Sequence, residues 1–90
     1  DCFVHFSYSD LFASIKNIKK SNCKYILSTT FTKHTFNYNI ITGDWRPLNL
    51  QIAPFNFPKP IQIINETYEK EFEREFKGKS LALWRRSELP

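Results

Sequence analysis

Two short stretches of this 90-residue sequence carry side chains that could act on a bound molecule. The first stretch holds His5, within the apolar residues 2–6, which we expect to be the end of a strand or the loop just after it. A neutral imidazole placed just before a helix can take a proton from a hydroxyl or an amine, so His5 is a candidate catalytic base. Packing or helix capping by His5 is the alternative.

The second stretch is Asp44-Trp45-Arg46, which lies in a polar, irregular region after the turn signal Gly43-Asp44. Arginine offers a planar fork for a carboxylate or a phosphate, and tryptophan offers a stacking face and one donor. Together these residues predict a site for an aromatic or anionic substrate. The alternative is an anchored loop, with Trp45 buried and Arg46 paired with Asp44.

Other residues are weaker candidates. Asn39 and Asn49 could orient a substrate, although asparagine is common in turns. No Ser/His/Asp or Cys/His pairing has a recognisable context, and no His/Cys cluster has zinc spacing, so we predict neither hydrolysis nor a metal. The two cysteines make a poor disulfide framework. We expect reduced thiols in a cytoplasmic protein, with one bridge in a secreted domain as the alternative.

Composition predicts one domain or a fragment spanning residues 1–90. Aromatic residues make up 17% of the chain, more than one small core normally holds, so some must be exposed, line a site or pack on a partner. The net charge of +4 is spread along the chain, so a solvated surface is favoured and nucleic acid is an unlikely partner. The alternative is a non-enzymatic module that binds nucleic acid or an acidic protein through Lys16, Lys20, Lys24 and Arg85.

No run is long and apolar enough for a membrane span, and no secretion signal is recognisable. The chain starts at Asp1 and contains no methionine, so we expect a processed product or part of something longer.

The elements that must position these residues follow from local patterns. Ser7 as an N-cap, with Leu11, Ile15 and Ile18 at helical spacing, predicts a helix over 7–20. Residues 25–31 are a near-continuous β-prone run, typical of a buried strand in a parallel sheet.

Residues 32–60 are mostly irregular and carry several anchoring aromatics, which is typical of a functional loop. Within them, residues 48–52 alternate as a strand would. Residues 61–65 and 80–84 are predicted strands that could pair antiparallel. Between them, residues 66–77 form a charged helix or connector that ends at Gly78 as a C-cap.

The order of these motifs resembles the C-terminal half of a class I S-adenosylmethionine-dependent methyltransferase, among small uncharacterised methyltransferase-like proteins. The most specific part is Thr42-Gly43-Asp44-Trp45-Arg46-Pro47-Leu48-Asn49-Leu50. Weaker parts are His5 before the capped helix, Lys24 to Phe31, Asn39-Ile40, Ala53-Pro54-Phe55, Phe57-Pro58, Ile64-Asn65-Glu66 and Lys79 to Trp84.

The resemblance implies an α/β fold: a partial Rossmann-like sheet with a helix, a buried parallel strand, a long loop and an antiparallel C-terminal strand pair. Asp1 to His5 would leave the fourth strand, with Asp1 and His5 on the cofactor and His5 also catalytic. Residues 25–31 would be the fifth strand, and 61–65 with 80–85 the sixth and seventh. Asp44, Trp45, Arg46 and Asn49 would contact a small-molecule methyl acceptor.

The glycine-rich cofactor loop and the ribose-binding acid of that family have no counterpart here. Gly43 and Gly78 are the only glycines, and neither follows a strand and opens a helix. The chain alone is therefore expected to bind S-adenosylmethionine weakly or not at all. The expected partners are the missing N-terminal half of the domain or a second copy in a homodimer.

Overall fold

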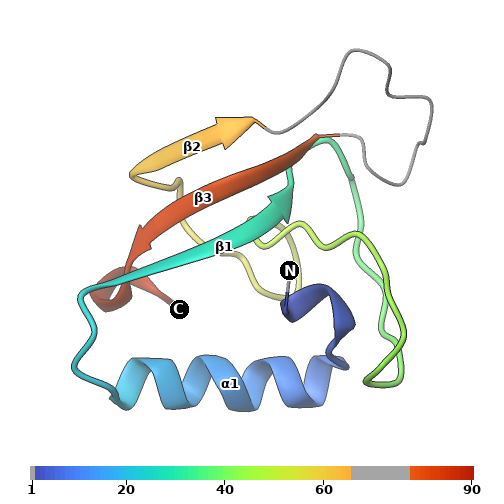
Figure 1. Cartoon of the computed structure of the whole chain (residues 1–90), viewed down its shortest axis with the longest axis horizontal. Coiled ribbons are helices and arrows are strands. Elements are labelled where there is room, and N and C mark those ends of the chain that lie inside the picture. The colour runs from blue at the N-terminus through green and yellow to red at the C-terminus, as the bar shows by residue number, and fades with distance from the viewer. Residues whose placement is uncertain (1, 66–77) are drawn as a thin grey trace.

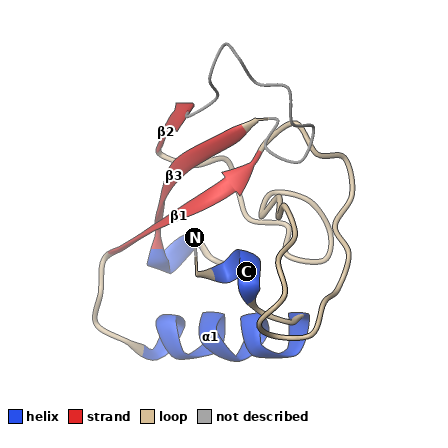
Figure 2. Ribbon diagram, turned by 45° about the vertical axis from the view of Figure 1, so that its right-hand side comes forward, coloured by secondary structure: helices blue, strands red, loops and turns tan. Residues whose placement is uncertain are grey.

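A computed structural model describes residues 2–65 and 78–90, which form a small mixed α/β domain (Figure 1). The short 3₁₀ helix η1 (Phe3–His5) leads into helix α1 (Tyr8–Lys20). Strand β1 (Tyr25–Phe31) follows, and a long loop (residues 32–61) connects it to strand β2 (Gln62–Asn65). Strand β3 (Lys79–Arg85) and the 3₁₀ helix η3 (Arg86–Glu88) come last. Figure 2 shows η1 and η3 lying between the sheet and α1.

Helix α1 forms as its sequence predicts. The Ser7 hydroxyl accepts a hydrogen bond from the Asp10 amide at 3.2 Å, and this satisfies one of the free N–H groups of the first turn. Leu11 and Ile15 are buried. The helix ends at Ser21, whose amide donates to the Ile18 carbonyl at 3.0 Å. The predicted helix over 7–20 is therefore confirmed.

The three strands pair in the order β1-β3-β2, with β3 antiparallel to both neighbours. Leu27 pairs with Leu83 across β1 and β3, and Ile64 pairs with Leu81 across β2 and β3. The predicted antiparallel pairing of the two C-terminal strands is therefore confirmed.

The prediction that residues 25–31 form a buried strand in a parallel sheet is wrong for the described residues. β1 is an edge strand paired antiparallel with β3, and its first half is exposed. Tyr25 and Leu27 are 52% and 60% exposed. The β-branched and aromatic run shows strand propensity, which does not depend on how many faces are covered.

Two other local predictions change. Residues 3–5 form a 3₁₀ turn, so of the two predicted alternatives, a strand end or the loop just after a strand, the strand end is wrong. Residues 48–52 alternate in character but form no strand. The Phe31 amide donates to the Leu48 carbonyl at 2.9 Å, but no ladder follows, because the Leu50 amide donates to the Thr30 side chain. The predicted charged helix or connector 66–77 lies outside the described residues, as do Asp1 and Glu66.

The core lies on one face of β3. Ala82 and Trp84 are fully buried there, and the Phe57 ring meets Trp84 edge to face at 5.1 Å. The Trp84 indole donates to the Pro58 carbonyl at 2.7 Å. The long loop thus supplies the layer that covers this face, together with Leu11 and Ile15 of α1.

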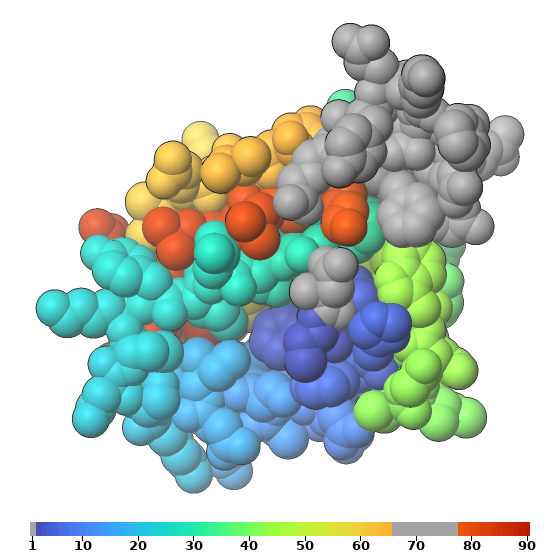
Figure 3. All heavy atoms as spheres, in the orientation of Figure 1, coloured from blue at the N-terminus to red at the C-terminus, as the bar shows by residue number. Residues whose placement is uncertain are grey.

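The opposite face of the sheet carries exposed apolar side chains. Ile64 is 57% exposed, and Leu27 lies on the same face because its partner Leu83 alternates with the buried Ala82 and Trp84. Figure 3 shows β1 reaching the surface between β3 and α1. Among the described residues, no helix has the length and apolar character needed to cross a membrane.

Candidate functional site

Residues 42–46 of the long loop lie against η1, and this contact assembles the candidate site. The Gly43 amide donates to the His5 carbonyl at 2.8 Å, and the Arg46 amide donates to the Val4 carbonyl at 3.2 Å. Gly43 has φ +110, a conformation that L side chains rarely adopt, and it lies in the turn that brings these amides into place. The sequence candidates His5, Asp44 and Arg46 are therefore neighbours in space.

The ring of His5 is oriented by this loop. Its Nδ1 lies 2.9 Å from the main-chain carbonyl oxygen of Asp44. A carbonyl oxygen can only accept, so Nδ1 carries the proton in this contact. In the neutral ring the lone pair then lies on Nε2. Because His5 is exposed, this arrangement leaves a fixed imidazole with a basic nitrogen available to a ligand.

The same loop also caps the start of α1. The Thr42 hydroxyl accepts from the Ser7 amide at 2.9 Å and donates to the Asp10 carboxylate. The Asn39 side-chain carbonyl accepts from the Tyr8 amide at 2.8 Å. The amides of Ser7, Tyr8 and Asp10 at this helix end are therefore used within the protein and are not available to an anion.

Arg46 lies at the centre of the assembly and is fully buried. Its Nη1 donates to the carbonyls of Phe3 and Val4, both at 3.1 Å, and its Nε donates to the carbonyl of Tyr38 at 3.1 Å. Its guanidinium carbon lies 5.6 Å from the centre of the Tyr8 ring. The guanidinium thus fixes the two carbonyls immediately before His5.

No carboxylate of the described residues pairs with Arg46, so the predicted alternative of an Asp44–Arg46 pair is absent there. Burial lowers the pKa of Arg46, and the nearby phenols of Tyr8 and Tyr38 act in the opposite direction. Its Nη2 is buried and has no hydrogen-bond partner among the described residues. A buried charge that is held by carbonyls and one aromatic ring, without a carboxylate, is costly.

Trp45 and Asn49 help to hold the loop in place. The half-buried Trp45 ring meets Phe31 edge to face at 6.1 Å. Asn49 is 5% exposed; its Nδ2 donates to the His34 carbonyl at 2.9 Å, and its Oδ1 accepts from the Gln51 amide at 3.1 Å. The contact of either residue with a substrate stays a prediction.

Sequence reasoning missed Asn37 and did not predict how the strand residue Thr30 contacts the loop, although both organise the site. Asn37 donates from Nδ2 to the carbonyls of Asn49 and Ala53, both at 2.9 Å, and accepts from the Asn49 amide at 2.9 Å. The hydroxyl of the buried Thr30 accepts from the Leu50 amide at 2.9 Å. Turn-forming asparagine and a strand threonine are ordinary in sequence, so no local signal distinguished them.

The described residues do not fit a nucleotide cofactor. Gly43 lies in the turn beside His5, and Gly78 immediately precedes β3 with its Cα against Lys33, so neither forms a glycine-rich turn between a strand and a helix. Asp1, predicted to contact the cofactor, lies outside the described residues. No group of three or more His, Cys, Asp or Glu side chains in residues 2–65 and 78–90 could hold a metal.

No protein-family model, curated protein or solved structure matches this chain.

Proposed function

We propose that the chain forms the acceptor-side part of an S-adenosylmethionine-dependent methyltransferase that acts on a small molecule. The proposal starts from the resemblance of residues 42–50. It is supported by their position, because residues 42–46 lie against η1 and contact both the ring and the backbone of His5. The antiparallel pair β2–β3 also agrees with the strand arrangement that the resemblance implies.

The observation that carries the proposal is the 2.9 Å contact between His5 Nδ1 and the Asp44 carbonyl. It holds the imidazole in the tautomer whose Nε2 can accept a proton. In the proposed reaction, Nε2 takes the proton from an acceptor hydroxyl or amine, which makes the acceptor atom nucleophilic. Arg46 acts as a positioning residue, because its guanidinium holds the carbonyls of Phe3 and Val4.

S-adenosylmethionine would supply the methyl group, but the described residues do not form its site. We therefore expect no binding of S-adenosylhomocysteine to this chain when it is titrated alone by calorimetry. Saturable one-site binding would show that these residues, or a dimer of them, build a cofactor pocket, and it would contradict our account of the missing loop.

NMR spectroscopy tests the role of His5 directly. Long-range ¹H–¹⁵N spectra should show the neutral ring protonated at Nδ1, and small phenols or amines should shift the signals of His5 and residues 42–46. His34, the second histidine in the chain, is an internal reference. Acceptor-like molecules that shift only distant residues, or an Nε2-protonated His5, would refute the proposal.

A second candidate function is nucleic-acid binding without chemistry, and one surface feature favours it. A hollow of about 240 Å³ is lined by Lys24, Tyr25, Arg85, Arg86 and Ser87. The exposed cations Lys24 and Arg85 flank the exposed Tyr25 ring, whereas Arg86 donates to the carbonyls of Cys23 and Lys19. Phosphates would lie on the cations and a base on Tyr25. Fluorescence anisotropy with a single-stranded oligonucleotide should then show affinity that falls steeply with salt. Absence of binding at low salt would exclude this candidate.

A further inference from the structure

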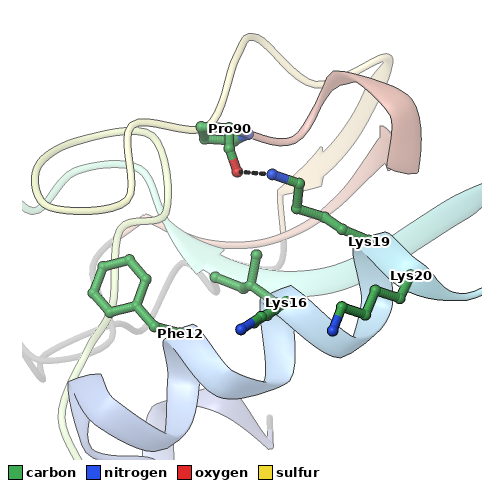
Figure 4. A pocket seen from close by; sticks show the side chains of 6 residues that line it. Phe12, Lys16, Lys19, Lys20 and Pro90 are labelled. Carbon is green, nitrogen blue, oxygen red and sulfur yellow. Dashed lines mark hydrogen bonds between the residues drawn. The ribbon is translucent and has the colours of Figure 1, made fainter.

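A second hollow lies on the C-terminal half of α1, away from His5. It has a volume of about 350 Å³ and is lined by Phe12, Ile15, Lys16, Lys19, Lys20 and Pro90 (Figure 4). This volume is within the range of sites that hold small organic molecules. None of the six side chains that line the hollow is acidic, so both the shape and the side-chain charge of the hollow restrict what it can bind.

The apolar part of the hollow is preformed. Ile15 is 5% exposed and belongs to the core. Phe12 is 45% exposed, and its ring is supported from the loop side by Phe55 at 5.0 Å between ring centres. A half-exposed ring that is held by a second ring presents a fixed apolar surface to a ligand.

The lysines of this helix end are not needed to cap it. The Ser21 amide and hydroxyl both donate to the Ile18 carbonyl, at 3.0 and 2.7 Å. Arg86 Nη1 donates to the Lys19 carbonyl at 3.0 Å. The negative end of the helix dipole is therefore partly satisfied by other groups.

Lys16 and Lys20 are four residues apart, and Figure 4 shows their side chains extending from the same side of α1. Lys19 differs, because its ammonium group donates to the Pro90 carbonyl at 2.9 Å and so ties Pro90 to the helix. Within residues 2–65 and 78–90, neither the Lys16 nor the Lys20 ammonium group forms an ion pair or a hydrogen bond. Two positive charges are thus available beside an apolar surface.

We propose that this hollow binds a small amphipathic anion: an aromatic or short acyl group that carries a carboxylate or a phosphate. The apolar body would lie on Phe12 and Ile15, and the anionic group would lie between Lys16 and Lys20. A simple inorganic anion would leave the apolar surface in water, and an uncharged aromatic molecule would leave both ammonium groups unused. The combination of the two parts selects the ligand class.

The test is an NMR titration of the whole chain with naphthyl phosphate, and with inorganic phosphate and naphthol separately. We expect saturable binding of naphthyl phosphate, with shifts at residues 12–20, and at least tenfold weaker binding of each separate part. Equal affinity for inorganic phosphate or for naphthol would overturn the proposal. Binding to anionic lipid vesicles without any response to naphthyl phosphate would overturn it in favour of a membrane surface.

Matched variants distinguish binding at a local site from a general effect of the net charge. The double substitution Lys16→Gln, Lys20→Gln should weaken naphthyl phosphate binding roughly tenfold, since each partly exposed charge contributes modestly. Lys33→Gln with Lys59→Gln has the same net charge and should leave the affinity unchanged. All four side chains are exposed, so folding should be preserved and can be checked by circular dichroism. Equal weakening by both pairs would overturn the proposal.

Discussion

Gly78→Ala tests how the long loop is closed onto the sheet. Gly78 has φ +75, and a Cβ at this position would lie 2.5 Å from the Lys33 amide nitrogen and 2.4 Å from Lys33 Cγ. The Lys33 side chain could rotate away, but its backbone nitrogen cannot. The Thr32 amide also donates to the Gly78 carbonyl at 3.0 Å, so the two segments are held together at this point.

Gly43→Ala is the matched control, because Gly43 has φ +110 but a Cβ added there would meet no described atom within 4 Å beyond its chain neighbours. Both variants carry the strain of a positive φ, about 1–2 kcal/mol. Only Gly78→Ala adds an overpacking cost of about 1–3 kcal/mol, so this variant should lose about 2–5 kcal/mol of its free energy of unfolding in total. In a domain of this size that lowers Tm by at least about 8 °C.

The assay is urea and thermal unfolding of both variants, followed by tryptophan fluorescence. We expect Gly78→Ala to lose clearly more stability than Gly43→Ala, or to fail to fold while Gly43→Ala folds. Losses that agree within about 0.5 kcal/mol, the usual scatter for a neutral surface substitution, would refute the argument from close approach.

Three further changes test the interior. Arg46→Lys should reduce the free energy of unfolding by about 3 kcal/mol in urea, because one ammonium group cannot reach all three carbonyls that the guanidinium binds; a loss below about 1 kcal/mol would contradict this. Burial raises the pKa of Tyr8 above 10.0, so its contribution to stability is present below pH 10 and lost as pH rises further; Tyr8→Phe should therefore lose less stability than the wild type as pH is raised above 10. Thr30→Val should cost about 1–3 kcal/mol by leaving the buried Leu50 amide without its acceptor, whereas Thr30→Ser should recover most of it.

The local elements of the fold could be predicted from sequence because their causes are local. Ser7 caps α1 through the amide of Asp10, three residues away. The apolar spacing of Leu11 and Ile15 selects the buried side of that helix. The strand 25–31 follows from β-branched and aromatic residues, which favour a pleated backbone wherever it lies.

The neighbour of β1 could not be predicted in the same way. The run from Tyr25 to Phe31 gives no indication that β3 pairs with it antiparallel or that Leu27 stays exposed. Those outcomes depend on residues at the other end of the chain. A continuous apolar run is compatible with a strand covered on two faces and with an edge strand whose far face is open.

In the candidate site too, some features could be predicted from the sequence and others depend on the tertiary structure. Residue type alone identified His5, Asp44 and Arg46, because the hydrogen-bonding and charge properties of imidazole, carboxylate and guanidinium groups follow from the residue type. Only the tertiary structure decided that the Asp44 carbonyl orients His5 and that Arg46 is buried among carbonyls without a carboxylate partner in the described residues. The physical reason is that backbone carbonyls and amides are the same at every position in the sequence. Which of them meet a given side chain is determined by how distant segments pack.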